Sequence, residues 1–162
     1  MSDFEHRTKV NQVQDKRIKL HVWDTLGQEK YKTLSPNYYR GSLGIIFCYA
    51  ANNRTTFENL QYWKDQVQNN GGADSCKILI ATKSDAPNKE VDKAEGEKKA
   101  KEWGMNFFET SSKEDLGVER AIEFLAQQIK TTKVDAHLNN QNGMRLNPVQ
   151  NDQNQEERKC AC

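Results

Sequence analysis

The sequence predicts an α/β fold, because strand-like segments alternate with segments that have helical spacing. Residues 16–24 alternate Ile18, Leu20 and Val22 with polar residues, which is the pattern of a half-buried strand. Residues 3–13 precede this strand and are predicted to pair with it as a hairpin.

Three later segments, residues 43–50, 77–81 and 105–110, are apolar without alternation. Such runs suit strands that are buried on both faces, as in a parallel sheet. The order hairpin, strand, helix, strand, helix, strand, helix therefore predicts a mixed, mostly parallel sheet with helices on both faces.

Helix start and stop signals separate these strands. Thr55 and Glu58 have the spacing of a capping box, and Asp92 and Glu95 repeat it. Gly104 provides a stop signal after the second helix. The third helix has the clearest apolar stripe, formed by Val118, Ala121, Ile122, Leu125 and Ile129, and is predicted to end near Lys130.

The composition changes after this helix. Residues 1–130 are predicted to form one domain, whereas residues 131–162 are rich in Asn and Gln and poor in large apolar residues. Such a segment buries too little apolar surface to offset the entropy of ordering, so we expect a disordered tail.

Charge and hydropathy exclude several classes of protein. A net charge of +1 gives no global electrostatic reason to expect nucleic-acid binding. There is no apolar run long enough for a transmembrane helix, and the first residues are too polar for a signal peptide, which predicts an intracellular protein. Cys48 and Cys76 lie in or beside apolar runs and are expected to be buried, reduced thiols.

Polar residues follow three of the predicted strands. Asp24 and Gln28 follow the first, "TKSD" (82–85) follows the next, and "ETSSK" (109–113) follows the last. Ligands of open α/β sheets bind beyond the carboxyl ends of the strands. Each segment alone could be an ordinary loop, but three in this order indicate a shared binding site.

These segments, together with "WDTLGQEKYKTLSPNYYRGSLGIIFCYA" (23–50), resemble the Rab branch of the Ras-like small GTPases. The resemblance covers roughly residues 2–130 and the last three residues. It implies a Ras-like P-loop NTPase fold, binding and slow hydrolysis of GTP with Mg²⁺, and a role in intracellular vesicle trafficking.

The resemblance also implies roles for individual residues. Asp24 would hold Mg²⁺ through water, the Gly27 N–H would meet the γ-phosphate, and Gln28 would orient the attacking water. Asp85 would accept hydrogen bonds from guanine, with the side-chain stems of two lysines packed on the base. The implied nucleotide-binding residues are Gly27, Thr82, Lys83, Asp85, Ser111, Ser112 and Lys113.

The phosphate-binding pattern G-x-x-x-x-G-K-[ST] begins at none of the nine glycines. By the resemblance, the chain would start inside switch I and lack the first strand, the phosphate loop and the first helix. That strand would lie between the hairpin and residues 43–50. We therefore expect either direct pairing of those two elements or a slot between them, in a marginally stable, aggregation-prone domain that is a monomer when folded.

Three positions depart from the usual family pattern: Leu26 replaces Ala, Thr82 replaces Asn, and "YAANN" (49–53) replaces an expected Asp after the Tyr. Two alternatives to a working GTPase therefore stay open. One is a non-catalytic Rab-like binding module, and the other is a gene-model fragment without stable nucleotide binding.

The chain ends in Cys160-Ala161-Cys162, which resembles the Rab pattern for double geranylgeranylation. A free thiol pair or half of a metal site are the alternatives. The resemblance implies attachment through the prenyl groups to the cytosolic face of endomembranes. It also implies as partners the Rab escort and prenylation machinery, the GDP-dissociation inhibitor, and effectors at switch II.

Overall fold

The α/β class predicted from the sequence is confirmed. A computed structural model describes residues 6–13, 16–24, 39 and 41–135 of the chain. No helix in this described part is long and apolar enough to cross a membrane.

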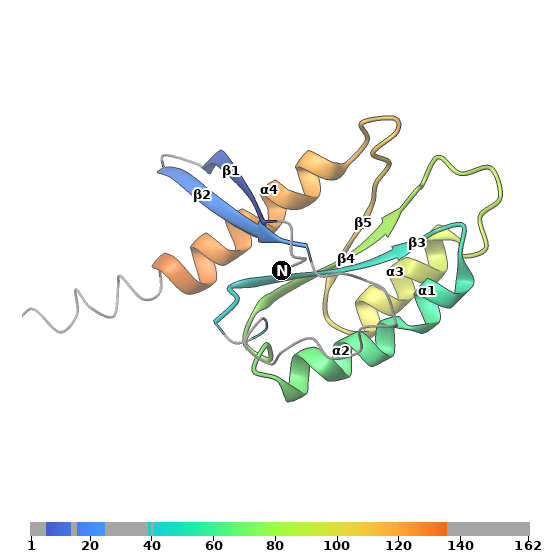
Figure 1. Cartoon of the computed structure of the whole chain (residues 1–162), viewed down its shortest axis with the longest axis horizontal. Coiled ribbons are helices and arrows are strands. Elements are labelled where there is room, and N and C mark those ends of the chain that lie inside the picture. Colours follow the sequence, from blue (N-terminus) through green and yellow to red (C-terminus); the bar gives the residue numbers. More distant parts are fainter. Residues whose placement is uncertain (1–5, 14–15, 25–38, 40, 136–162) are drawn as a thin grey trace, which may run out of the picture.

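The strands form two separate sheets (Figure 1). The first is an antiparallel hairpin in which His6 pairs with Trp23 and Val13 with Lys16. The second is parallel and has the order β3-β4-β5. The strands are β1 (His6–Val13), β2 (Lys16–Trp23), β3 (Gly44–Ala50), β4 (Cys76–Thr82) and β5 (Asn106–Glu109).

Helices cover both faces of the parallel sheet, as predicted (Figure 1). The predicted cap at Asp92 is confirmed, because its carboxylate accepts a hydrogen bond from Glu95 N at 2.8 Å. The predicted cap at Thr55 is wrong. The cap is Asn53, whose side chain accepts from Thr56 N. The helices are α1 (Arg54–Glu58), α2 (Leu60–Asn69), α3 (Lys93–Glu102) and α4 (Val118–Ile129), which continues as the π-helix η3 (Lys130–Asp135).

The core has two halves, one on each face of β3-β4-β5. Strand side chains alternate between faces, so Leu79 packs toward α1, α2 and α3, whereas Ile78 packs toward α4. Both side chains are completely buried. The central strand β4 therefore has a fixed orientation, and its carboxyl end is a rigid support for the loop that follows.

The hairpin does not pair directly with β3, and the two belong to separate sheets. Among the described residues β3 pairs only with β4, which leaves one edge of β3 open. The expected burial of Cys76 is confirmed, but that of Cys48 is wrong because its side chain is exposed. Cys48 lies on the same face of β3 as Ile46, and α4 covers Ile46 without covering Cys48.

Gly117 provides the first testable prediction. Its φ is +73°, and a Cβ at this position would lie 2.4 Å from the carbonyl oxygen of Glu109. Gly104 is the matched control, because its φ is +67° but a Cβ there would meet nothing within 4 Å. We expect Gly104→Ala to lower the free energy of unfolding by about 1 kcal/mol through backbone strain alone.

Gly117→Ala should lower the free energy of unfolding by at least twice as much as Gly104→Ala does, because the Glu109 backbone must also move. Urea denaturation of both variants measures the two losses. Equal losses would show that the close approach at Gly117 does not matter.

Candidate functional site

Two loops meet at the carboxyl ends of β4 and β5, where the sequence predicted the binding site. The strands are parallel neighbours, with Ala81 opposite Glu109. Backbone hydrogen bonds continue past the strand ends: Thr110 N donates to Ala81 O at 2.8 Å, and Ser84 N donates to Thr110 O at 3.0 Å. The loop carrying Asp85 is therefore held directly beside the loop carrying Ser111.

The Asp85 carboxylate is the centre of this site. The Ser111 hydroxyl donates a 2.6 Å hydrogen bond to Asp85 Oδ1, and Lys113 Nζ lies 3.9 Å from Asp85 Oδ2. Ser111 is completely buried and its Oγ also accepts from Glu114 N at 3.1 Å, so its position is fixed. The Asp85 side chain itself remains partly exposed. A well-oriented carboxylate thus faces solvent at the sheet edge.

The same contacts keep Asp85 ionised. The Ser111 hydrogen bond lowers the pKa of Asp85 below its ordinary value, and the ammonium groups of Lys113 and Lys89 act in the same direction. The carboxylate can therefore accept two hydrogen bonds from one planar ligand edge at neutral pH.

Lys83 and Thr82 shape the first loop. Lys83 has a left-handed backbone with φ 55°, and its carbonyl accepts from Ala86 N at 3.0 Å, which closes a turn around Asp85. The Thr82 hydroxyl donates to Tyr49 O at 3.0 Å and so joins β4 to β3. Thr82 therefore holds the ends of β3 and β4 together, and Lys83 provides the left-handed residue of the turn.

The other predicted residues are more scattered. Ser112 and Lys113 are exposed beside Asp85. Asp24 is exposed at the end of β2, and among the residues described here no hydrogen bond or ion pair joins it to Asp85. Gly27, Gln28 and Leu26 lie outside the described residues, as do Cys160 and Cys162.

Asp24 does have an electrostatic effect on β3. The surrounding protein raises the pKa of the Cys48 thiol to about 11, although this side chain reaches solvent, and the Asp24 carboxylate acts in the same direction. Within the described ranges, no group of three His, Cys, Asp or Glu side chains could hold a metal ion.

Sequence reasoning missed the ion pairs around Glu109. Lys89 Nζ lies 3.7 Å from Glu109 Oε1, and Lys93 Nζ lies 4.0 Å from Glu109 Oε2. These pairs connect the segment after Asp85 to the end of β5. Glu109 was visible in the "ETSSK" segment, but no sequence signal singled out Lys89 or Lys93 as its partners.

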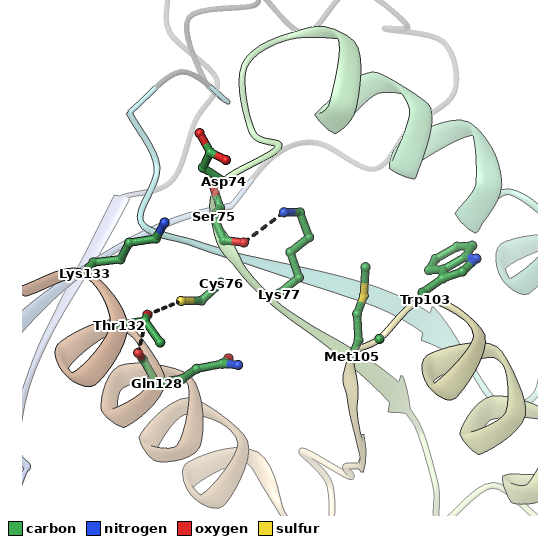
Figure 2. A pocket seen from close by; sticks show the side chains of 10 residues that line it. Asp74, Ser75, Cys76, Lys77, Trp103, Met105, Gln128, Thr132 and Lys133 are labelled. Atoms are coloured by element: carbon green, nitrogen blue, oxygen red, sulfur yellow. Dashed lines mark hydrogen bonds between the residues drawn. The ribbon is translucent and has the colours of Figure 1, made fainter. Parts of the chain in front are cut away.

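A pocket of about 360 Å³ lies elsewhere, at the amino end of β4 (Figure 2). Its polar groups largely contact each other: Cys76 Sγ lies 3.1 Å from Thr132 Oγ1, which donates to Gln128 O, and Lys77 Nζ donates to Ser75 O. Ligands of parallel sheets bind at the carboxyl ends, so the Asp85 cluster is the better candidate site.

The comparisons with known proteins show the family of the chain. The family model described as the Ras family matches residues 2–131. Rab-13 of Bos taurus is 38% identical over 140 residues, which is 86% of this chain and 69% of the relative. Rab-13 of Mesocricetus auratus is 42% identical over 128 residues, 78% of this chain and 62% of the relative. Rab-8A of Bos taurus is 40% identical over 137 residues, 84% of this chain and 65% of the relative.

The chain thus belongs to the Ras family of small GTPases. Within that family it is a Rab-like small GTPase, the class that serves intracellular vesicle trafficking, and it spans about two-thirds of the length of these curated relatives. The Ras family generally binds guanine nucleotide with Mg²⁺. The family match confirms the predicted Ras-like fold.

Ser111→Ala tests the geometry at Asp85. Loss of the hydroxyl should raise the pKa of the Asp85 carboxyl toward its ordinary value. Because the native pKa is depressed, this ionisation stabilises the fold above roughly pH 4, and its contribution disappears as the pH falls through the lowered pKa. The difference in stability between the native chain and Ser111→Ala should shrink over the same acid range.

Carbon NMR titration of the Asp85 carboxyl measures this change in its pKa directly. Ser112→Ala is the matched control, since Ser112 is an exposed neighbour and should leave the Asp85 titration unchanged. An unchanged Asp85 titration in Ser111→Ala would contradict the role of the Ser111 hydrogen bond in lowering the pKa of Asp85.

Proposed function

We propose that this Rab-like chain recognises the guanine base of GTP and GDP through Asp85. The observation that carries the proposal is the 2.6 Å hydrogen bond by which the buried Ser111 holds the Asp85 carboxylate at the junction of β4 and β5. Guanine presents two N–H donors along one edge, and a carboxylate can accept both. Adenine offers no such pair, so this contact alone distinguishes the two bases.

The neighbouring residues complete the proposed base site. The stems of Lys83 and Lys113 would pack against the two faces of the base, and the backbone around Ser112 would donate to the guanine carbonyl. The exposure of Lys113 and Ser112 supports this role, because both can reach a bound ligand.

For hydrolysis we propose the roles implied by the family. Asp24 would hold Mg²⁺ through water, the Gly27 N–H would contact the γ-phosphate, and Gln28 would orient the attacking water. A bound Mg²⁺ would neutralise charge on the phosphates. These assignments rest on the Rab-like sequence around residues 23–28.

Two observations favour a second candidate, a non-catalytic Rab-like binding module. The 162 residues contain no G-x-x-x-x-G-K-[ST] pattern, and among the described residues the edge of β3 beside the hairpin is open. Such a module would keep guanine recognition and the surfaces for Rab partners, without holding the phosphates firmly enough for hydrolysis.

Guanine selectivity tests the proposal. The isotope-labelled chain would be titrated with GMP and with AMP to millimolar concentrations while amide NMR shifts are recorded. GMP should shift the amides of residues 83–86 and 111–114, and AMP should not. Asp85→Ala should abolish the GMP response. Equal responses to both nucleotides, or none to GMP, would contradict guanine recognition.

We further propose that Cys160 and Cys162 each carry a geranylgeranyl group in cells. Two prenyl chains anchor a protein stably where one is marginal. This would attach the protein to the cytosolic face of endomembranes. The proposed partners are the Rab escort and prenylation machinery, the GDP-dissociation inhibitor, and effectors at switch II, with the folded chain acting as a monomer.

Mass spectrometry of the protein from eukaryotic cells, co-expressed with the escort protein, should find both cysteines modified. Modification of the chain without the escort should be inefficient, because the escort binds the folded domain. Cys160→Ser combined with Cys162→Ser is the negative control. Unmodified cysteines in the co-expressed protein would refute the anchor.

A further inference from the structure

The pocket at the amino end of β4 lies at the opposite end of the strand from Asp85, so it is separate from the proposed guanine site (Figure 2). Its volume of about 360 Å³ is within the range of small-molecule sites. The start of β4, the loop between α3 and β5, and the end of α4 with η3 all contribute lining residues. A bound molecule would therefore contact segments that are far apart in the sequence.

Two ammonium groups line this pocket. Lys77 Nζ donates to Ala73 O at 2.5 Å and to Ser75 O at 2.9 Å, which leaves one of its three N–H groups for a ligand. Within the described ranges, neither Lys77 nor Lys133 forms an ion pair. Burial lowers the pKa of Lys77 and the Lys133 ammonium acts in the same direction, against the opposing effect of the Asp74 carboxylate. An anionic group placed here would meet two cations and relieve their repulsion.

Trp103 and Met105 form an apolar wall of the same pocket. Lys64 Nζ lies 4.7 Å from the centroid of the Trp103 ring, and this cation–π contact holds the ring in place. Aromatic rings pack well against Trp, and the thioether of Met also makes favourable contacts with aromatic rings. The wall therefore favours a ligand with an aromatic ring.

Gln128 adds an unpaired polar atom. Its Oε1 is buried and has no hydrogen-bond partner among the residues that the structure describes. Figure 2 shows the side-chain amide of Gln128 pointing away from α4, in the direction of Met105. A buried carbonyl oxygen without a donor is unfavourable, so a ligand that supplies an N–H or O–H would gain affinity here.

The π-helix η3 fixes this side of the pocket. Thr132 Oγ1 lies 3.1 Å from Cys76 Sγ and donates to Gln128 O at 2.7 Å, which joins η3 to both β4 and α4. Helices of this kind are rare and are frequently found at functional sites. Gln128 and Lys133 are therefore held in position before any ligand binds.

We propose that this pocket binds a small aromatic molecule that carries an anionic group at one end and a hydrogen-bond donor on its ring. The anion would contact Lys77 and Lys133, and the donor would bond to Gln128 Oε1. The ring would pack against Trp103 and Met105. The site is independent of guanine recognition and of the prenyl anchor, so its test does not depend on either.

The experiment uses the full isotope-labelled chain, as the monomeric fraction from gel filtration, with indole-3-acetate as the probe. This probe should shift the amide NMR signals of residues 75–77 and 103–105 and the side-chain amide of Gln128. Indole-3-acetamide, which is the same shape without the charge, should bind about tenfold more weakly. Acetate, which has the charge without the ring, should cause no shift at the same concentration.

Charge removal tests the cationic contacts. Lys77→Gln combined with Lys133→Gln should weaken binding of indole-3-acetate by about tenfold and abolish its advantage over indole-3-acetamide. Lys133→Gln alone keeps the hydrogen bonds of Lys77 and should weaken binding severalfold. Lys98→Gln combined with Lys101→Gln is the matched control, since it removes the same charge from exposed positions of α3 and should have no effect.

Gln128→Leu tests the ring donor. This variant should bind indole-3-acetate severalfold more weakly than the native chain does, because the leucine side chain has no acceptor. It should not weaken the binding of 1-methylindole-3-acetate, which has no N–H to donate.

Four results would overturn the proposal. They are no response of the pocket signals to indole-3-acetate at several millimolar, equal binding of indole-3-acetate and indole-3-acetamide, an equal loss in the α3 control variant, and an equal loss of both indole acids in Gln128→Leu.

Discussion

The chain should unfold about 10–20 °C higher when it is extended at its amino end by an apolar strand and a G-x-x-x-x-G-K-[ST] loop of the Ras-family type. The reason is the open edge of β3, which pairs with β4 alone among the described strands, beside a hairpin that forms its own sheet. Burying roughly 200 Å² of apolar surface at about 25 cal/mol per Å² stabilises the fold by about 5 kcal/mol. That is a large part of the stability of an ordinary domain.

Calorimetry of the extended and unextended chains measures the difference. The matched control is the same extension with two prolines in its strand, since proline cannot donate to the sheet and should remove the gain. The unextended chain should bind a hydrophobic dye and show a broad transition. The account would be contradicted if the unextended chain bound no dye, unfolded sharply and gained no unfolding temperature from the extension. The edge of β3 would then already be covered in the unextended chain.

The same extension should raise the affinity for GDP by about ten-thousandfold. The unextended chain carries the proposed base-binding residues but no G-x-x-x-x-G-K-[ST] pattern, so we expect a dissociation constant weaker than micromolar for GDP and GTP. Three charge-assisted hydrogen bonds from the loop, at roughly 2 kcal/mol each, correspond to that gain.

Fluorescent-nucleotide titration measures both constants. Replacing the loop lysine of the extended chain by alanine should remove a large part of the gain, because that lysine neutralises phosphate charge. A micromolar or tighter dissociation constant for the unextended chain would contradict this assignment.

The strands and helices could largely be predicted because their signals are local. Apolar runs located β3 and β4, and the Asp92 cap and Gly104 bracketed α3, where the structure confirms them. Thr55 failed as a cap because Asn53, two residues earlier, already holds Thr56 N, and a capping pattern does not decide between neighbouring candidates.

Tertiary features could not be predicted from local patterns. Cys48 has an apolar sequence context, yet it is exposed because no described helix covers its end of β3. The Asp85–Ser111 hydrogen bond joins residues 26 positions apart and depends on the register of β4 and β5. Sequence resemblance indicated that both residues serve one site, whereas the structure shows that the buried serine orients the exposed carboxylate.

The central claim is that Asp85 recognises guanine, and Asp85→Asn in the extended chain tests it most directly. Asn presents one acceptor and one donor in place of two acceptors, which fits xanthine, whose corresponding edge has one donor and one acceptor. We predict that this variant binds GDP at least a hundredfold more weakly and xanthosine diphosphate more tightly than the parent does, since each mismatched bond to a charged group is worth roughly 2 kcal/mol. Unchanged affinity for GDP, with no gain for xanthosine diphosphate, would contradict the claim.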